Sequence, residues 1–144
     1  MYKHILIPTD GSELSDMAIT QGIALAKALH AKVTVLTVSP TFGTVVVDSV
    51  VTATPEQYRK DCEARAEKYL GVGTGAARAA GVPCETLHGV HDHPYQMILE
   101  TATAQGCDLI CMAPHGHRGV IGLVLGGETT RVLTHGKIPV LVCR

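Results

Sequence analysis

Five short apolar runs, rich in β-branched residues, recur along the chain and predict five β-strands. They are His4–Pro8, Lys32–Val38, Cys84–His88, Asp108–Ala113 and Pro139–Cys143. Several of them are continuously apolar instead of alternating, which is the pattern of a strand that is covered on both faces. Strands of this kind are typical of a parallel sheet that lies between two layers of helices.

Longer segments with a helical period separate these runs. The first, Ser12–His30, begins with a serine that can act as an N-cap. Further helices are expected from Thr54–Pro55 to about Ala80, from His93–Pro94 to Gly106, and over Gly127–Thr134. Gly71 and Gly73 weaken the middle of the second helix, because glycine is a poor helix former.

The alternation of strand and helix predicts one α/β domain over residues 1–144, Rossmann-like and three-layered, with a five-stranded parallel sheet. The crossovers are expected to be right-handed, with helices on both faces. The first strand of such a sheet commonly lies in the middle, so we expect the strand order 3-2-1-4-5. The irregular apolar stretch Phe42–Ala53 is expected either to fold over the domain or to meet a partner.

The amino-acid composition argues for a globular protein and against some functions. The chain is 46% apolar and 17% charged, with a net charge of −1, so it can bury a core without disulfides or a metal. Near-neutral charge and only five Phe and Tyr residues argue against nucleic-acid binding. An odd number of cysteines without CxxC spacing, together with no signal peptide or membrane segment, favours a reduced, cytoplasmic protein.

Two loops are the candidates for a ligand site, because ligands of open parallel sheets bind beyond the carboxyl ends of the strands. Pro8–Ser12 follows the first strand, and Met112–Thr130 follows the fourth. The second loop contains Gly116, Gly126 and Gly127, which allow backbone amides near a helix start to approach a phosphate. The alternative is that these glycines only mark turns and the start of a helix.

Three segments of the chain resemble the universal stress protein family: HILIPTDGSE, DLICMAPHG and LGGETTRVLTHGKIPVLV. The resemblance spans the whole chain, and its last block is the most specific part. It implies an α/β domain with a five-stranded parallel sheet. It also implies ATP binding through the motif G-x2-G-x9-G-(S/T), and a homodimer formed through the last strand.

The match to this motif is partial. Gly116 and Gly126 correspond to its second and third glycines, with nine residues between them. Ala113 stands in place of the first glycine and adds a methyl group near the nucleotide. Gly127 stands in place of the final Ser/Thr, so that a hydroxyl is lost and a backbone amide is kept.

The resemblance implies that Pro8, Thr9, Asp10 and Val38 line an adenosine pocket, with Met112 beside the base. Asp10 suits the hydroxyl or amine donors of a nucleoside. The full set of candidate nucleotide-binding residues is Pro8, Thr9, Asp10, Val38, Met112, Ala113, His115, Gly116, Arg118, Gly126, Gly127 and Glu128. The implied ligand is ATP, AMP or another adenine nucleotide, with Mg²⁺. His115 is equally compatible with a solvated loop, and for Arg118 an exposed loop charge is the favoured alternative to a phosphate contact.

Other chemistry is less well supported by the sequence. The segment HGVHDH, with His88, His91, Asp92 and His93, could hold zinc, but its spacing matches no standard site and polar residues are expected in such a turn. We therefore expect no metal site there. The chain has no GxxxxGK(S/T) phosphate loop and no GxSxG nucleophile elbow. No catalytic residue is assigned.

The sequence thus predicts a universal-stress-type protein that binds an adenine nucleotide and acts through dimerisation or through an unknown protein partner. The β-rich run Ile138–Cys143 is the expected dimer edge. Two alternatives stay open: an interaction module that is independent of nucleotide, and a slow ATP hydrolase. Fast turnover is not expected, because the glycine-rich loop offers few groups that could be held in a fixed geometry.

Overall fold

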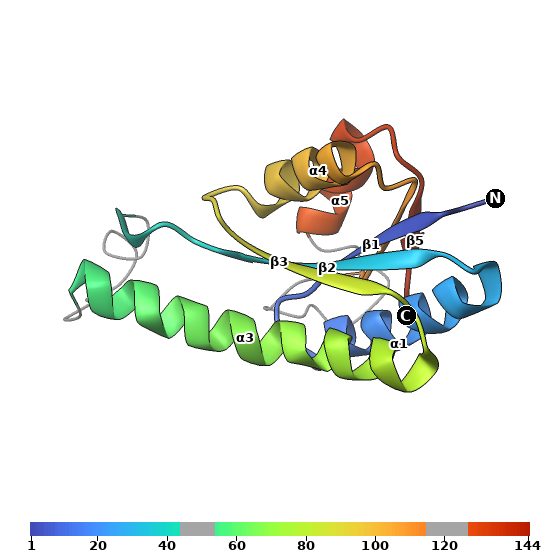
Figure 1. Ribbon diagram of the computed structural model, residues 1–144. Coiled ribbons are helices and arrows are strands. Elements are labelled where there is room, and N and C mark those ends of the chain that lie inside the picture. The colour runs from blue at the N-terminus through green and yellow to red at the C-terminus, as the bar shows by residue number, and fades with distance from the viewer. Residues whose placement is uncertain (44–53, 115–126) are drawn as a thin grey trace.

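The computed structural model describes residues 1–43, 54–114 and 127–144. It contains five parallel strands in the order β3-β2-β1-β4-β5, with helices on both faces (Figure 1). The elements are, in chain order, β1 (His4–Pro8), α1 (Glu13–Leu29), β2 (Lys32–Ser39), α3 (Pro55–Ala80), β3 (Cys84–Val90), α4 (Pro94–Gln105), β4 (Leu109–Met112), α5 (Gly127–His135) and β5 (Val140–Val142). The predicted fold class and strand order are confirmed.

Burial on both faces explains the continuous apolar runs of the strands. In β1, Ile5 and Ile7 belong to the core beneath α1 and α3, while Leu6 belongs to the core beneath α4 and α5. All three are 0% exposed. Burying such side chains contributes about 1.5–3 kcal/mol each to folding, so β1 is a main source of the stability of the fold.

Helix starts follow the caps that the sequence indicates. The Ser12 hydroxyl accepts a hydrogen bond from the Ser15 amide at 3.2 Å, and the Thr54 hydroxyl accepts one from the Gln57 amide at 3.1 Å. The α4 helix begins after His93 as predicted, but the His93 side chain makes no capping bond.

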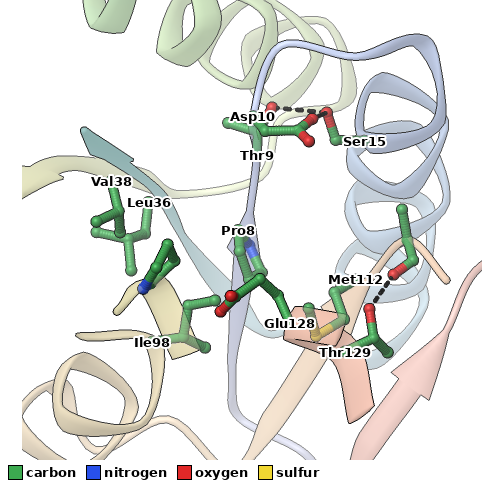
Figure 2. A pocket seen from close by; sticks show the side chains of 12 residues that line it. Pro8, Thr9, Asp10, Ser15, Leu36, Val38, Ile98, Met112, Glu128 and Thr129 are labelled. Carbon is green, nitrogen blue, oxygen red and sulfur yellow. Dashed lines mark hydrogen bonds between the residues drawn. The ribbon is translucent and has the colours of Figure 1, made fainter. Parts of the chain in front are cut away.

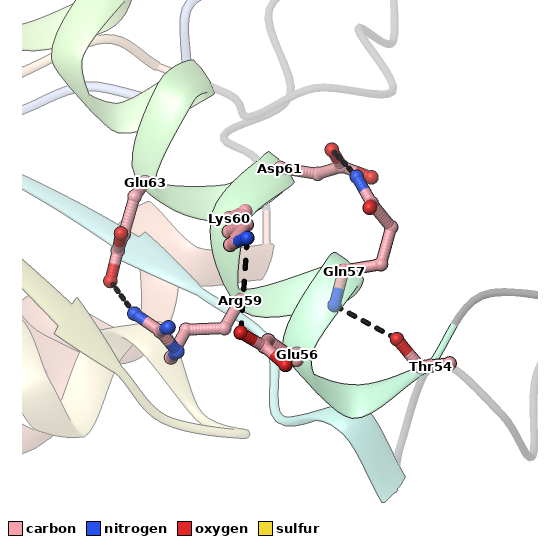
Figure 3. A network of polar contacts seen from close by, with 7 residues as sticks. All are labelled: Thr54, Glu56, Gln57, Arg59, Lys60, Asp61 and Glu63. Carbon is pink, nitrogen blue, oxygen red and sulfur yellow. Dashed lines mark hydrogen bonds and ion pairs between the residues drawn. The ribbon is translucent and has the colours of Figure 1, made fainter.

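The α3 helix is continuous through the glycines that were expected to weaken it. A Cβ at Gly73 would lie 2.7 Å from Cγ2 of Val35, so glycine lets the helix lie close to β2. The exposed first turns of α3 carry oppositely charged side chains that pair at helical spacing, and an amide side chain that pairs with a carboxylate in the same way (Figure 3). Arg59 and Glu63 are 2.8 Å apart, and Lys60 and Glu56 are 3.8 Å apart. Such exposed pairs contribute about 0.3–0.5 kcal/mol each.

Some boundaries differ from those predicted. β3 extends through Val90, which is beyond the expected His88, and β4 and β5 are shorter at both ends than their apolar runs. Pro139 has no amide hydrogen to donate to a ladder, so β5 begins after it. The α5 helix runs one residue further, to His135. Of Phe42–Ala53, residues 44–53 lie outside the described residues, so the expectation for this stretch is not addressed.

A polar clamp joins β1, β2 and β4 at their amino ends. The Asp108 carboxylate accepts hydrogen bonds from the amides of Lys3, at 2.8 and 3.1 Å, and of His4, at 3.0 Å. The His4 ring bonds the Thr34 hydroxyl at 2.7 Å and the Gln105 carbonyl at 3.1 Å. His4 is only 4% exposed. Its two partners match a neutral imidazole, in which one nitrogen donates and the other accepts.

Burial, helped by the positive charge of Lys32, lowers the pKa of His4 below its ordinary value. The folded chain therefore binds this proton more weakly than the unfolded chain, whose histidine pKa is about 6.5. The stability that neutral His4 provides is complete above about pH 6.5 and is lost as the pH falls through the folded pKa.

We expect His4→Gln to be less stable than the wild type at pH 8 and to lose less stability between pH 7 and pH 5. The amide keeps a donor and an acceptor but cannot take up the proton. Urea unfolding at several pH values measures this difference in slope. Equal slopes for the two chains would contradict the role of His4, and His30→Gln, at the exposed end of α1, provides the comparison for a histidine that is not buried.

Candidate functional site

A cavity of about 220 Å³ opens at the carboxyl ends of β1, β2 and β4. It lies where the strand order reverses, because the chain leaves β1 toward β2 on one side and returns to β4 on the other. Figure 2 shows the residues that line it: Pro8, Thr9, Asp10, Ser15, Leu36, Val38, Pro94, Ile98, Met112, Ala113, Glu128 and Thr129.

The walls of the cavity are mainly apolar. Leu36 and Val38 come from β2, Ile98 comes from α4, and Met112 is the last residue of β4. Pro8 ends β1 on the floor between them. Such a cleft favours a flat, poorly hydrated ring system over an extended polar chain, because apolar walls cannot satisfy many hydrogen bonds.

One rim of the cavity is a loop fixed by its own polar groups. The amide of Thr9 donates to the Leu36 carbonyl at 2.8 Å, and the Thr9 hydroxyl bonds Ser15 Oγ at 3.0 Å. The Asp10 carboxylate accepts from the Ser12 amide and from Ser15 Oγ, each at 3.0 Å. These bonds hold Asp10 at the cavity in a single orientation, which favours ligand binding because little freedom remains to be lost.

Gly11 gives this loop its turn. Its φ is +80°, and a Cβ at this position would lie 2.3–2.6 Å from ring atoms of Tyr69 in α3. Both the backbone conformation and the close approach of an aromatic ring therefore require glycine. The packing of Tyr69 on Gly11 connects the loop to the long helix.

The opposite rim is the first turn of α5. The Thr129 hydroxyl donates to the Ala113 carbonyl at 2.8 Å and joins α5 to the end of β4. One oxygen of Glu128 accepts the Tyr95 amide at 2.8 Å, and the other lies 3.3 Å from Arg131. Glu128 thus satisfies an amide at the amino end of α4 that has no partner within its own helix, where a negative charge is favourable.

The described lining carries two carboxylates, Asp10 and Glu128, and includes no Lys, Arg or His. This charge suits hydroxyl and amine donors of a ligand and opposes a phosphate placed deep in the cavity. The groups expected to meet phosphate, His115, Gly116, Arg118 and Gly126, lie outside the described residues.

Seven of the predicted site residues line the cavity together: Pro8, Thr9, Asp10, Val38, Met112, Ala113 and Glu128. Gly127 is the first residue of α5 but is not part of the lining, and a Cβ there would meet no atom of the described residues within 4 Å. Sequence reasoning missed Ser15, Leu36, Pro94, Ile98 and Thr129. Ile98 lies on the buried face of α4, and no local pattern distinguishes a core side chain from one that borders a cavity.

The histidine-rich turn is arranged differently from a metal site. His88 lies in β3 and bonds Ser39 at 2.8 Å, while His91 accepts the amide of His93 at 2.9 Å. The Asp92 carboxylate accepts from the Thr41 hydroxyl at 2.6 Å. Within residues 1–43, 54–114 and 127–144 no three His, Cys, Asp or Glu side chains gather as a metal would require. The same ranges contain no helix with the length and apolar character needed to cross a bilayer.

Comparison with known proteins agrees with the family resemblance of the sequence. The profile of the universal stress protein family matches residues 1–144. A universal stress protein of Methanocaldococcus jannaschii is 30% identical, with 100% of this chain and 83% of that protein covered. A universal stress protein of Thermus aquaticus is 31% identical, with 100% of both chains covered.

Solved structures agree in fold. The hypothetical protein MJ0577 superposes with a TM-score of 0.83 at 25% identity, covering 99% of this chain and 96% of the other. A universal stress protein of Archaeoglobus fulgidus in complex with dAMP has a TM-score of 0.72 at 17% identity, covering 99% and 98%. A universal stress protein family protein of Arabidopsis thaliana with AMP bound has a TM-score of 0.69 at 17% identity, covering 98% and 90%.

We expect Gly11→Ala to destabilise the chain by about 1–3 kcal/mol, because alanine is strained at this φ and its methyl group would collide with Tyr69. Gly71→Ala is the matched control, since a Cβ at that helical position meets no atom within 4 Å among the residues that the structure describes. It should stabilise by about 0.5–1 kcal/mol. Denaturant midpoints measure both changes, and an unchanged midpoint for Gly11→Ala would contradict the packing described for this loop.

Proposed function

Because the chain belongs to the universal stress protein family, we propose that it binds an adenine nucleotide in the cavity between β1 and β4. The observation that carries this proposal is the composition of the cavity: apolar walls with two fixed carboxylates at the rims, at the reversal of strand order. Proteins of the same fold hold AMP and dAMP, and a universal stress protein with 22% identity was solved in complex with cAMP.

The adenine ring is assigned to the apolar part of the cavity. Val38, Ile98 and Met112 offer it contact from three different elements. Asp10 would accept hydrogen bonds from the ribose hydroxyls or from an amine of the base, since an ionised carboxylate only accepts. Its own bonds to Ser12 and Ser15 leave it correctly placed before the ligand arrives.

The phosphates are assigned to the segment that carries Gly116, Gly126 and Gly127. This assignment comes from the resemblance to the family motif, and it is supported by the start of α5 at Gly127, on the same side as the cavity. A triphosphate with Mg²⁺ extends toward that segment more favourably than into the cavity, where Asp10 and Glu128 would repel it. We infer that ATP with Mg²⁺ and AMP share the nucleoside site.

A ligand role fits the described residues better than rapid catalysis. Fast phosphoryl transfer needs fixed cations near the phosphates and a group that orients water. Within the described ranges, the arginine on α5, Arg131, is paired with Glu128. We therefore infer that the nucleotide acts as a bound signal in a stress response, through a dimer or another partner, and that hydrolysis is slow.

The test is isothermal calorimetry with AMP and with Mg-ATP. We expect Kd values in about the micromolar range. Val38→Trp should weaken binding of both ligands at least tenfold, because Val38 is a half-buried lining residue and an indole would fill the cavity. Val90→Trp is the matched control, since Val90 is 57% exposed on β3 and lies outside the lining.

Equal loss of affinity in both variants would point to a general disturbance of the fold and would contradict the assignment to this cavity. Failure of the wild-type chain to bind either ligand would favour an interaction module that is independent of nucleotide. Adenosine, which has no phosphate, tests the cavity separately from the proposed phosphate segment, because it should compete with AMP for the cavity alone.

We also propose a homodimer formed through β5. This strand ends the sheet, so one edge of its backbone has no neighbouring strand within the described residues. It also presents Leu141, which is 41% exposed. Unpaired edges with apolar side chains favour association with another chain, and a second copy is the partner that the family resemblance implies.

We expect light scattering to give the mass of a dimer at micromolar concentration. Leu141→Lys should shift the chain toward the monomer, because it places a charge on the apolar edge. Leu133→Lys is the control, since Leu133 is similarly exposed at 43% but lies on α5. A monomeric wild type, or a dimer that survives Leu141→Lys, would contradict the assignment to β5.

A further inference from the structure

Two cysteine sulfurs lie next to each other under α1. Cys111 is in β4, Cys143 follows β5, and their Sγ atoms are 2.9 Å apart. The two residues are 0% and 2% exposed. Of the other cysteines, Cys62 contacts the Arg65 side chain and Cys84 contacts the Glu85 carbonyl. All five thiols are free in the structure.

The sheet itself brings these two sulfurs together. Cys111 pairs with Leu141, and the Cys143 amide donates to the Met112 carbonyl at 2.8 Å. Residues 141 and 143 share one face of an extended chain, because side chains alternate. Cys143 therefore points to the same side of the sheet as Cys111, in the core that α1 covers. The pairing depends on the register of β5 and not on a flexible loop.

We propose that Cys111 and Cys143 are a redox site, which forms a reversible disulfide within the chain when it meets a hydroperoxide. The sulfurs need to approach by about 0.9 Å to reach the covalent distance of about 2.05 Å. The proposal does not depend on nucleotide binding, since neither cysteine lines the cavity.

The two thiols differ in their place in the sheet and in acidity. A hydrogen bond from the Cys111 thiol lowers the pKa of Cys143, against the opposing effect of burial. The same hydrogen bond, together with burial, raises the pKa of Cys111. Cys143 lies beyond the edge strand and Cys111 lies within β4, so Cys143 is the sulfur that an oxidant reaches first. Its thiolate is the reactive form, which makes Cys143 the attacking group and Cys111 the resolving thiol.

The reaction balances in two steps. The Cys143 thiolate attacks one oxygen of the hydroperoxide, the O–O bond breaks, and the chain gains a sulfenic acid while the alkoxide or hydroxide leaves and takes up a proton. The Cys111 sulfur then attacks the sulfenic sulfur. The S–O bond breaks, the S–S bond forms, and the Cys111 proton leaves with the hydroxide as water. A dithiol reductant reverses the reaction by exchange.

Access to the buried pair comes from the shortness of β5. The strand has three residues and lies at the edge of the sheet. Beyond it, the Cys143 amide bonds Met112, and the exposed Gln21 side chain donates to the Arg144 carbonyl at 3.2 Å. When the proposed dimer dissociates, opening of these few bonds exposes Cys143 without unfolding the central strands, because edge elements open at low cost. The disulfide would then hold β5 against β4.

The experiment is thiol counting on the whole chain. Reduced protein is treated with hydrogen peroxide at neutral pH and then denatured in the presence of N-ethylmaleimide, which labels the free thiols. It is analysed by mass spectrometry before and after proteolysis. We expect three labelled cysteines instead of five, a monomeric mass, and a linked peptide pair that contains Cys111 and Cys143. Dithiothreitol should restore five labels.

Cys143→Ser and Cys111→Ser should each keep all four remaining thiols free of disulfide. Cys84→Ser is the matched control: it removes a more exposed thiol, and it should still lose two labels. Should either serine variant fail to fold, the peptide map of the wild type decides. The proposal would be overturned by the persistence of five labels, by a link between other cysteines, or by a bond between two chains. It would also be overturned if native and urea-unfolded protein gave the same mixture of links.

Discussion

The position of β1 at the centre of the sheet is the constraint on which the rest of the structure depends. Ile5, Leu6 and Ile7 are fully buried, and they direct alternate side chains into the two cores. Because β2 lies on one side of this strand and β4 on the other, the loops after β1 and β4 must separate at their carboxyl ends. The cavity is the space that this separation leaves, and its apolar walls are continuous with the cores.

Polar groups then fix the rims of the cavity. Asp10 and Ser15 hold the loop after β1, and Thr129 holds α5 to the carbonyl of Ala113. Glu128 has two functions in this arrangement, since it borders the cavity and also satisfies the Tyr95 amide at the start of α4. The described rims of the cavity are therefore held in place by the chain's own bonds, an arrangement that lowers the conformational entropy a ligand would lose there.

The sequence predicted the fold well because strand burial and helix caps are local signals: the β1 boundaries and the Thr54 cap agree with the structure. Seven of the residues predicted for the site line one cavity, because they follow strand ends or match family segments. Ile98 and Leu36 were missed, because the neighbours of a side chain on a helix or strand are set by tertiary packing. The same reason hid the role of Gly73 and the meeting of Cys111 with Cys143, which are distant in sequence.

The central claim is that the cavity between β1 and β4 is a nucleoside site. Methyl-resolved NMR during a titration with AMP tests it most directly, because it reports each side chain separately. The account predicts that the methyl signals of Leu36, Val38, Ile98 and Met112 shift together with one saturation curve, while those of Val72 and Leu133, which are exposed and do not line the cavity, do not. Saturable shifts that are confined to other methyl groups, with these four unchanged, would contradict it.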